Sequence, residues 1–261
     1  MLKVVIIGAN GLVGKGIFDL LKEKKDITLL KVTRENISDF NNIECDVIIN
    51  ANGSGKKGWC NENPSKSFDT NCYSLYKVLD KFTPKRYILI SSVDVYPFTN
   101  SVDTTFEDIT IDPIKLSPYC LHKYIAEMII KNNFSDFLIL RLSNVIGPGL
   151  KKNVLFDLTR KRNLFLSPFS KMNFIDTETI AEVVYQNLLK CKYSIMNCAA
   201  QNSLKVSDII ENLDLSLYYK DSFKSNLPLF SYEINTTRLS KVFEIGSSEE
   251  YVEKYIISKK K

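Results

Sequence analysis

Short runs of consecutive apolar residues alternate with longer stretches in which apolar residues recur at every third or fourth position. Uninterrupted apolar runs are typical of parallel strands that are buried on both faces. They predict strands over residues 3–7, 27–32, 46–50, 86–90, 137–142, 172–175 and 193–197. The intervening stretches predict helices over residues 12–24, 64–82, 118–131 and 178–189. This alternation predicts an α/β fold, a doubly wound parallel sheet with helices on both faces.

The alternation loosens after Gly147-Pro148-Gly149, resumes near residue 172 and becomes irregular after residue 199. A last helix is indicated by Ser247-Ser248-Glu249-Glu250, which has the form of a capping box. We therefore expect residues 1–146 and 172–199 to form the sheet domain, and residues 147–171 and 200–261 to form a smaller second part.

A glycine-rich turn, Gly8-Ala9-Asn10-Gly11-Leu12-Val13-Gly14, follows the first predicted strand and opens the first predicted helix. Gly8 suits the tight turn, Gly11 lets the backbone approach a pyrophosphate, and Gly14 lets helix and strand pack closely. The start of the helix offers free N–H groups and a positive dipole end to phosphates. This order of strand, glycines and helix predicts a Rossmann-type dinucleotide site. Its expected contacts are Gly8, Asn10, Gly11, Leu12, Val13 and Gly14.

The end of the second strand bears on the choice of cofactor. It reads Lys31-Val32-Thr33-Arg34-Glu35, with no carboxylate at its tip to bond both ribose hydroxyls of NAD. Arg34 can instead grip a 2′-phosphate with two hydrogen bonds, and Thr33 can add a hydroxyl. NADP(H) is therefore favoured over NAD(H). An exposed arginine, with Glu35 repelling the phosphate, is the alternative.

Tyr119 and Lys123 lie four residues apart on a predicted helix, so their side chains share a face. A free phenol has a pKa of about 10, and a nearby ammonium favours the phenolate. We therefore expect Tyr119 to act as an acid or base near neutrality, and Lys123 to hold the nicotinamide ribose as well. Ser91 and Ser92 follow the fourth strand at the edge where parallel sheets bind ligands, and either hydroxyl can point into the site. A surface Tyr–Lys pair and a turn serine are the structural alternatives.

Several motifs, in this order, resemble the extended short-chain dehydrogenase/reductase family of nucleotide-sugar enzymes across nearly the whole chain. Besides the glycine turn, they are Ser-Ser-x-x-Val-Tyr at 91–96, Ser117-Pro118-Tyr119 through Lys123, Arg141-Leu142-Ser143-Asn144-Val145-Ile146-Gly147-Pro148, Phe174-Ile175-Asp176 and the strand with Asn197. The resemblance implies that Ser92 polarises the substrate, that Tyr119 donates the proton and that Lys123 is its partner. It also places Asn144 at the substrate and Asn71 near the cofactor.

Further contacts follow from the same resemblance. The expected cofactor contacts then also include Asn50, Ala51, Asn52, Ser91 and Leu142. The expected substrate contacts include Val93, Asp94, Lys152 and Asn153, with the nucleotide diphosphate near Asn144, Lys151, Lys152 and Asn153. Ordinary loop charges are the equal alternative for the two lysines.

The chain also departs from the family pattern. Pro97 stands where glycine is usual, Asp176 replaces a common histidine, and the second strand is followed almost at once by the third. In its shortness the chain looks like the dTDP-4-dehydrorhamnose reductase branch. The short C-terminal segment implies that the second part is a small, discontinuous substrate-binding cap.

The same scaffold supports reductases, epimerases and dehydratases. The dehydratases of the family need an acid–base pair after the serine position, where this chain has Val93 and Asp94. Valine cannot donate a proton, which disfavours dehydration. We therefore predict an NADPH-dependent reductase of a nucleotide-diphosphate 4-keto-6-deoxy sugar. An NAD(P)-dependent nucleotide-sugar epimerase and a non-catalytic dinucleotide-sensing scaffold remain as alternatives.

Composition narrows the remaining classes. The net charge of +5, with Lys259-Lys260-Lys261 as its plainest source, fits a solvated basic surface or attraction of an anionic substrate, and nothing resembles a dense nucleic-acid-binding stripe. Six cysteines without a C-x-x-C pair indicate buried thiols in a reducing compartment. The single histidine, His122, disfavours a His-based metal site and is expected to face solvent or pack beside its helix.

No apolar run has the length of a signal peptide core or a membrane span, so we expect a cytoplasmic protein without membrane contact. Residues 53–58 are expected to be a flexible stretch, with Trp59 bordering the sugar site or packing in a loop. By family analogy, helices 64–82 and 118–131 are candidates for a homodimer interface.

Overall fold

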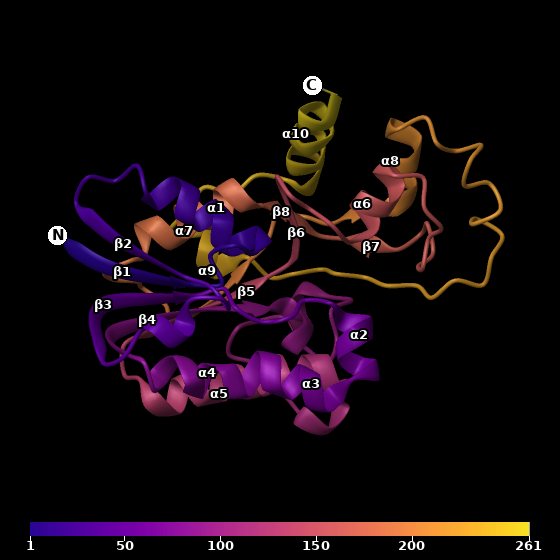
Figure 1. Ribbon diagram of the computed structural model, residues 1–261. Helices are drawn as coiled ribbons and strands as arrows, with labels where there is room; N and C mark the ends of the chain where they lie inside the picture. Colours follow the sequence, from indigo (N-terminus) through magenta and orange to yellow (C-terminus); the bar gives the residue numbers. More distant parts are fainter. Residues whose placement is uncertain (261) are drawn as a thin grey trace.

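The computed structural model describes residues 1–260 and is built around a six-stranded parallel sheet (Figure 1). Lys261, the last residue of the basic tail, lies outside the described residues. The strand order is β2-β1-β3-β4-β5-β9. Its strands are β1 (Leu2–Ile7), β2 (Ile27–Val32), β3 (Ile43–Asn50), β4 (Phe82–Ser92), β5 (Phe137–Leu142) and β9 (Ile195–Cys198). The order reverses between β1 and β3, and ligands bind outside the carboxyl ends of parallel strands at such a switch point.

Two helical layers cover this sheet, so the predicted Rossmann-like α/β fold is confirmed. α1 (Leu12–Leu21) and α7 (Thr177–Gln186) lie above the sheet in Figure 1, and α4 (Ser74–Leu79) and α5 (Pro118–Asn133) lie below it. Alternate residues of β1 serve the two layers: Val4 and Ile6 pack in one apolar cluster, and Val5 and Ile7 in the other. Each such residue, removed from water, contributes about 1.5–3 kcal/mol, which explains the uninterrupted apolar runs.

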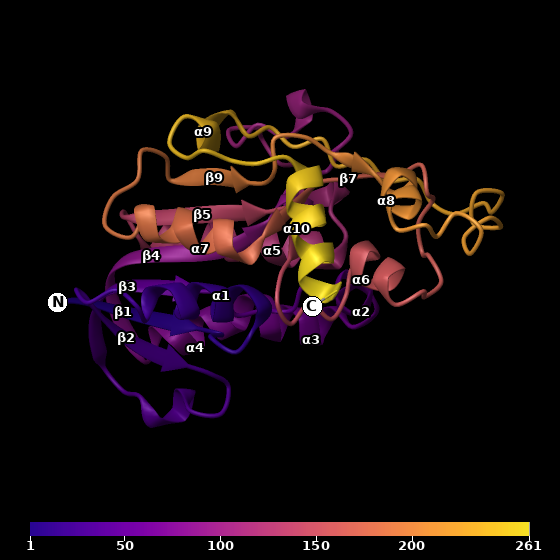
Figure 2. The ribbon, with the colours of Figure 1, turned by 90° about the horizontal axis from the view of Figure 1, so that it is seen from above.

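The rest of the chain lies beyond the carboxyl edge of the sheet, at the right of Figures 1 and 2. Its elements are β6 (Asn144–Ile146), which pairs with β8 (Phe174–Asp176), β7 (Lys171–Met172), which pairs with β10 (Leu204–Lys205), and the helices α6 (Val154–Thr159), α8 (Val206–Asn212), α9 (Thr237–Ser240) and α10 (Ser248–Lys260). α9 is the exception, because it packs against β9. The division into a sheet domain and a cap stays a prediction.

α10 begins with the capping box expected from the sequence. The Ser247 N–H donates to Glu250 Oε2 over 2.7 Å, and the Glu250 N–H donates to Ser247 Oγ over 3.2 Å. These reciprocal bonds satisfy two backbone donors that would otherwise lack partners at the start of the helix.

The helix expected over residues 64–82 is interrupted and shorter than predicted. It is divided into α3 (Pro64–Phe68), a π-helical turn at Asp69–Tyr73 and α4, and the chain has already entered β4 at Phe82. Side chains take backbone carbonyls that a regular helix would use: Asn71 Nδ2 donates to Ser67 O over 3.1 Å, and Ser74 Oγ donates to Thr70 O over 2.7 Å. Such bonds compete with the regular ladder and are hidden from a periodicity pattern.

Two other local expectations are wrong. The stretch taken as flexible runs directly into α2 (Lys57–Glu62), which is fixed from outside because Asn61 Oδ1 accepts the Tyr119 N–H over 3.0 Å. The single strand expected over residues 172–175 is split into β7 and β8, which belong to two different small sheets.

Two surface features remain. The α3–α5 layer exposes the apolar side chains of Phe68, Tyr73, Tyr76 and Met128, and pairing of two copies through it stays a prediction. Within residues 1–260, no helix combines the length and the apolar character that crossing a membrane requires.

Candidate active site

The glycine turn has the conformation that a dinucleotide cradle requires. Gly8 has φ +77°, and a Cβ there would lie 2.9 Å from Ala51 O. A Cβ on Gly14 would lie 2.3 Å from Gly8 O, so only glycine lets α1 pack this closely on β1. No side chain caps the N-terminus of α1, and its first turn has no acidic residue. The N–H groups around Leu12 and Val13 are thus available to phosphate oxygens, and the turn fits a dinucleotide pyrophosphate.

The tip of β3 forms the wall beside this turn. Asn50 Nδ2 donates to the Tyr87 hydroxyl over 2.6 Å, and Asn50 Oδ1 accepts the Asn52 N–H over 2.9 Å. The Asn50 side chain therefore shapes the turn, and the backbone of Ala51 and Asn52 is what borders Gly8. The Asn71 side chain also shapes this wall, because its Oδ1 accepts the Ser54 N–H over 3.0 Å and so holds the loop after β3.

The tip of β2 differs from its sequence interpretation. Arg34 is exposed and available to a ligand. The Thr33 hydroxyl, however, lies beside the Glu35 carboxylate and lowers the pKa of that carboxyl group. A carboxylate therefore stands near the end of β2, as the alternative interpretation of this segment, with Glu35 repelling the phosphate, expects.

Ser92 and Tyr119 come together at the carboxyl edge of the sheet. Ser92 ends β4, and Tyr119 lies in the first turn of α5, where it is 5% exposed and its phenol lies near the Ser92 hydroxyl. Burial raises the pKa of Tyr119 strongly and the Asp94 carboxylate raises it further, whereas the bond to Ser92 lowers it. The expected role of Tyr119 as an acid or base stays a prediction, and the side chains that act on the pKa of its phenol include Asp94, Ser92 and Lys57. The phenol holds its proton, which is the form that a proton donor needs.

Lys123 lies beneath this pair rather than against the phenol. Its Nζ donates to Ile90 O over 2.9 Å, and burial lowers the pKa of the ammonium to about 8, although the Glu127 carboxylate opposes the shift. Ser91 Oγ is bonded to Glu127 Oε1 over 2.6 Å. The hydroxyl of Ser91 therefore faces α5, and Ser92 is the serine whose hydroxyl faces Tyr119.

Asp94 is the predicted substrate contact with the most partners. Its Oδ1 accepts from Lys57 Nζ over 2.7 Å and from the Tyr232 hydroxyl over 2.8 Å, and its N–H donates to Ser92 Oγ over 3.2 Å. Val93, between them, is buried in an apolar cluster with Val95, and Tyr232, a partner of Asp94, packs against the same cluster.

The other predicted substrate contacts are spread along the loop after β5. Asn144 Nδ2 donates to Asn173 O over 3.1 Å. Asn153 is the N-cap of α6, with its Oδ1 on the Phe156 N–H and its Nδ2 on Val145 O, so its amide is already satisfied. Lys152 reaches back across the site, because a Cβ on Gly55 would lie 3.0 Å from its Nζ.

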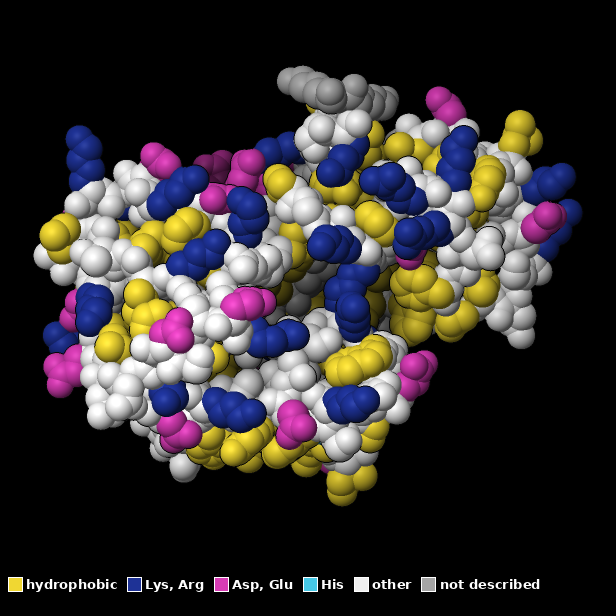
Figure 3. Space-filling view, in the orientation of Figure 1, with side chains coloured by type: hydrophobic (Ala, Val, Ile, Leu, Met, Phe, Trp, Pro, Cys, Tyr) yellow, Lys and Arg dark blue, Asp and Glu magenta, His cyan; other side chains and the backbone are white. Residues whose placement is uncertain are grey.

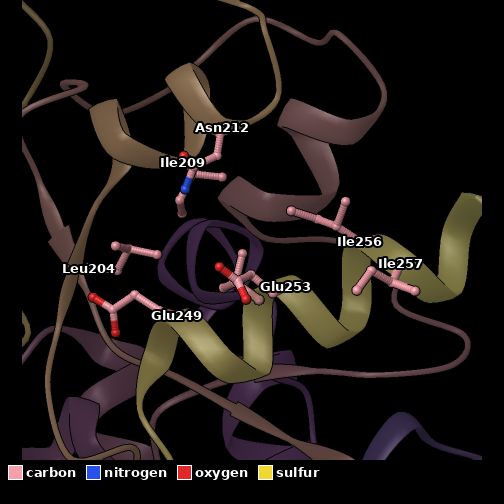
Figure 4. A pocket seen from close by; sticks show the side chains of 8 residues that line it. Leu204, Ile209, Asn212, Glu249, Glu253, Ile256 and Ile257 are labelled. Atoms are coloured by element: carbon pink, nitrogen blue, oxygen red, sulfur yellow. The ribbon is translucent and has the colours of Figure 1, made fainter.

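The arrangement leaves an open basic region. Figure 3 shows a hollow near the middle of this face, between α6 and α10 above and α2 and α3 below, with Lys and Arg side chains around it. A separate pocket of about 200 Å³ lies between α8 and α10 and contains none of the predicted site residues (Figure 4).

Lys57 and Tyr232 were missed by sequence reasoning. The only sequence signal for Lys57 was weak: the apolar residues Trp59 and Cys60 that follow it indicate a short helix, α2, that begins at Lys57. Tyr232 had none, because it lies in an irregular segment. His122 packs beside its helix, one of the two placements expected from the sequence: it is buried, with Nδ1 2.8 Å from Ser67 Oγ. Leu142 is buried at the end of β5.

A Rossmann-like sheet with a tyrosine and a lysine at its carboxyl edge defines the class of NAD(P)-dependent oxidoreductases of the extended short-chain dehydrogenase/reductase type. The model of the family described as "NAD dependent epimerase/dehydratase family" matches residues 4–173. The chain therefore belongs to this family. No curated protein matches the chain.

Solved structures of such enzymes share the fold along their whole length. The dTDP-4-dehydrorhamnose reductase of Clostridium acetobutylicum ATCC 824 has 16% identity and a TM-score of 0.75, over 100% of both chains. The reductase of the same name from Bacillus anthracis str. Ames, in complex with NADP, has 17% identity and a TM-score of 0.73, over 99% of both chains. The UDP-N-acetylglucosamine 4-epimerase of Methanobrevibacter ruminantium M1, in complex with UDP-N-acetylmuramic acid, has 18% identity and a TM-score of 0.74, over 98% of both chains.

Proposed function

We propose that this chain is an NADPH-dependent reductase of nucleotide-diphosphate 4-keto-6-deoxy sugars. The observation that carries the proposal is the buried phenol of Tyr119, which keeps its proton and lies beside Ser92 at the carboxyl edge of the sheet. The dTDP-4-dehydrorhamnose reductases among the similar structures add support, one of them solved with NADP.

The residues divide the work of the reduction. When bound, the dinucleotide supplies a hydride to the carbonyl carbon. Tyr119 gives its proton to the carbonyl oxygen, and Ser92 donates a hydrogen bond to that oxygen as negative charge develops. The Asp94 N–H donates to Ser92 Oγ, and the Ser92 hydroxyl donates only a long bond of 3.4 Å to Asp94 Oδ2, which it can exchange for a bond to substrate. Lys57 is the cation that lowers the pKa of the Tyr119 phenol and so favours proton release from it, whereas Lys123, bonded to Ile90 O, is left to hold the nicotinamide ribose.

An epimerase is the second candidate, because a carboxylate stands near the tip of β2. Glu35 beside Thr33 suits the ribose hydroxyls of NAD, the cofactor that epimerases recycle. Reduction is preferred because Arg34, exposed at the tip of β2, suits the 2′-phosphate of NADPH, the cofactor that net reductases draw on. Val93, which follows Ser92 and is buried, offers no proton-transfer group and argues against dehydration.

Turnover of a substrate panel tests the proposal. The purified chain is mixed with NADPH and, one at a time, dTDP-, UDP- and GDP-linked 4-keto-6-deoxy sugars, while NADPH absorbance is followed and products are identified by NMR. We expect stoichiometric NADPH oxidation with at least one of these sugars. Sugar interconversion without net NADPH oxidation would favour the epimerase, and cofactor binding without any turnover would favour a sensor.

Arg34 and Glu35 give a matched pair of variants for the cofactor preference. Arg34→Ala is expected to weaken NADPH binding about tenfold or more and NADH binding little, because only NADPH carries the 2′-phosphate that a guanidinium binds. Glu35→Gln is expected to strengthen NADPH binding and weaken NADH binding. Dissociation constants from fluorescence titration of both cofactors measure this, and equal losses for the two cofactors in Arg34→Ala would refute the NADP(H) assignment.

A further inference from the structure

Asp94 carries more tertiary contacts than its local turn requires. The chain contains the same Ser-Val-Asp turn twice, at Ser92–Asp94 and at Ser101–Asp103, and in both the aspartate N–H donates to the serine Oγ over 3.2 Å. Asp103 has no ion-pair partner within residues 1–260. At Asp94, by contrast, Lys57 and Tyr232 have been added from distant parts of the chain. The turn folds without such partners, so they serve the carboxylate itself.

The two oxygens of Asp94 differ in their surroundings. Oδ1 accepts from both Lys57 Nζ and the Tyr232 hydroxyl. Within residues 1–260, Oδ2 has one hydrogen-bond partner, the Ser92 hydroxyl at 3.4 Å, and this bond is long and weak. Because a carboxylate oxygen can accept more than one bond, Oδ2 has capacity for a further donor beside the serine that contacts the reacting carbonyl.

Lys57 and Tyr232 hold this carboxylate in place. Although burial opposes it, the Asp94 carboxylate raises the pKa of Lys57, and burial together with Asp94 raises that of Tyr232, so both remain donors. Tyr232 is held on its own account, because its N–H donates to Lys171 O over 2.9 Å and the next N–H, of Glu233, donates to Thr99 O over 2.7 Å. The C-terminal segment thus delivers a rigid donor to the edge of the sheet.

We propose that Asp94 Oδ2 accepts a hydrogen bond from a hydroxyl on the carbon next to the reacting carbonyl, and that the site thereby selects keto sugars with a free vicinal hydroxyl. The inference rests on the proposed reductase function. Vicinal oxygens of a sugar ring lie about one hydrogen-bond length apart, which matches the adjacent Ser92 Oγ and Asp94 Oδ2. Lys57 and Tyr232 are positioning residues that act through Asp94. A substrate without the hydroxyl would leave a desolvated carboxylate oxygen unpaired, which is the strongest basis for discrimination.

The test compares two sugars and two aspartates. The wild-type chain, Asp94→Asn and the matched control Asp103→Asn are assayed with the accepted 4-keto-6-deoxy sugar nucleotide and with its 3-deoxy analogue. Wild type and Asp103→Asn are expected to prefer the hydroxylated sugar by about 10- to 100-fold in kcat/KM, the range of one hydrogen bond to a charged group. Asp94→Asn is expected to lose most of that preference, measured as the ratio of kcat/KM for the two sugars within one variant, while its NADPH affinity stays within about twofold. The ratio is used because the Asp94 carboxylate also raises the pKa of Tyr119 and so affects turnover of both sugars. Tyr232→Phe is expected to lose part of it.

Two outcomes would overturn the proposal. One is an undiminished preference in Asp94→Asn. The other is a result in which Asp94→Asn turns over neither sugar and also loses an uptake of solvent deuterium that wild type shows at the carbon next to the carbonyl. That result would make Asp94 an acid–base group. Calorimetric binding of non-reacting hydroxylated and 3-deoxy sugar nucleotides, with NADP⁺ present, separates this inference from the proposed function. Binding without turnover contradicts the reductase alone, and binding or turnover without preference contradicts the role of Asp94 alone.

Discussion

Replacing Tyr119 by phenylalanine is expected to lower kcat by about 10²–10⁴-fold while NADPH binding is retained. This range is typical for the loss of a positioned general acid. The phenyl ring keeps the buried packing of Tyr119, and the glycine turn that would hold the pyrophosphate is formed by other residues. The loss therefore falls on the proton transfer. Single-turnover NADPH oxidation and a separate fluorescence titration of NADPH measure the two quantities independently.

Tyr124→Phe is the matched control, since Tyr124 lies on the same helix, is half-buried and has no assigned hydrogen bond at the site. It is expected to keep turnover within about twofold, as a surface-type change away from special features does. Unchanged turnover in Tyr119→Phe would refute the proton-donor role, and an equal loss in both variants would point to a disturbed helix instead.

The fold was predictable wherever one local rule decided the structure. The strands have uninterrupted apolar runs because both faces of the sheet are covered, and Gly8 and Gly14 report backbone positions that no other residue can occupy. The prediction was wrong where side chains compete with the backbone, as Asn71 does in the π-helical turn. It was wrong again at α2, which depends on a contact between Asn61 and Tyr119 that is distant in sequence.

The site divides in the same way. Ser92, Tyr119 and Lys123 lie in contiguous motifs, so their spacing could be interpreted directly. The titration of Tyr119 could not be, because it depends on burial, and Lys123 turned out to donate to Ile90 O. Tyr232 reaches Asp94 only through the folding of the C-terminal segment, and no pattern near it indicates that contact.

Glu127→Gln is expected to destabilise the protein by about 3–5 kcal/mol, the usual cost of removing one partner from a buried ion pair. Glu127 is fully buried, and its Oε2 accepts from Arg141 Nη2 over 2.7 Å. Its Oε1 accepts from Arg141 Nε and from Ser91 Oγ. The substitution leaves the guanidinium of Arg141, itself 1% exposed, without a counter-charge. Since whole domains are stable by only about 5–15 kcal/mol, the loss is a large fraction of the total.

Urea unfolding followed by circular dichroism and by fluorescence of the single tryptophan, Trp59, measures this effect. Asp19→Asn is the control, because it removes an exposed ion pair with Lys15 that is expected to contribute about 0–1 kcal/mol. The double variant Glu127→Leu/Arg141→Leu is expected to cost less than the sum of its single variants, because neither charge is left buried alone. A urea midpoint of Glu127→Gln no lower than that of Asp19→Asn would show that the buried pair between α5 and β5 contributes little to the stability of the fold.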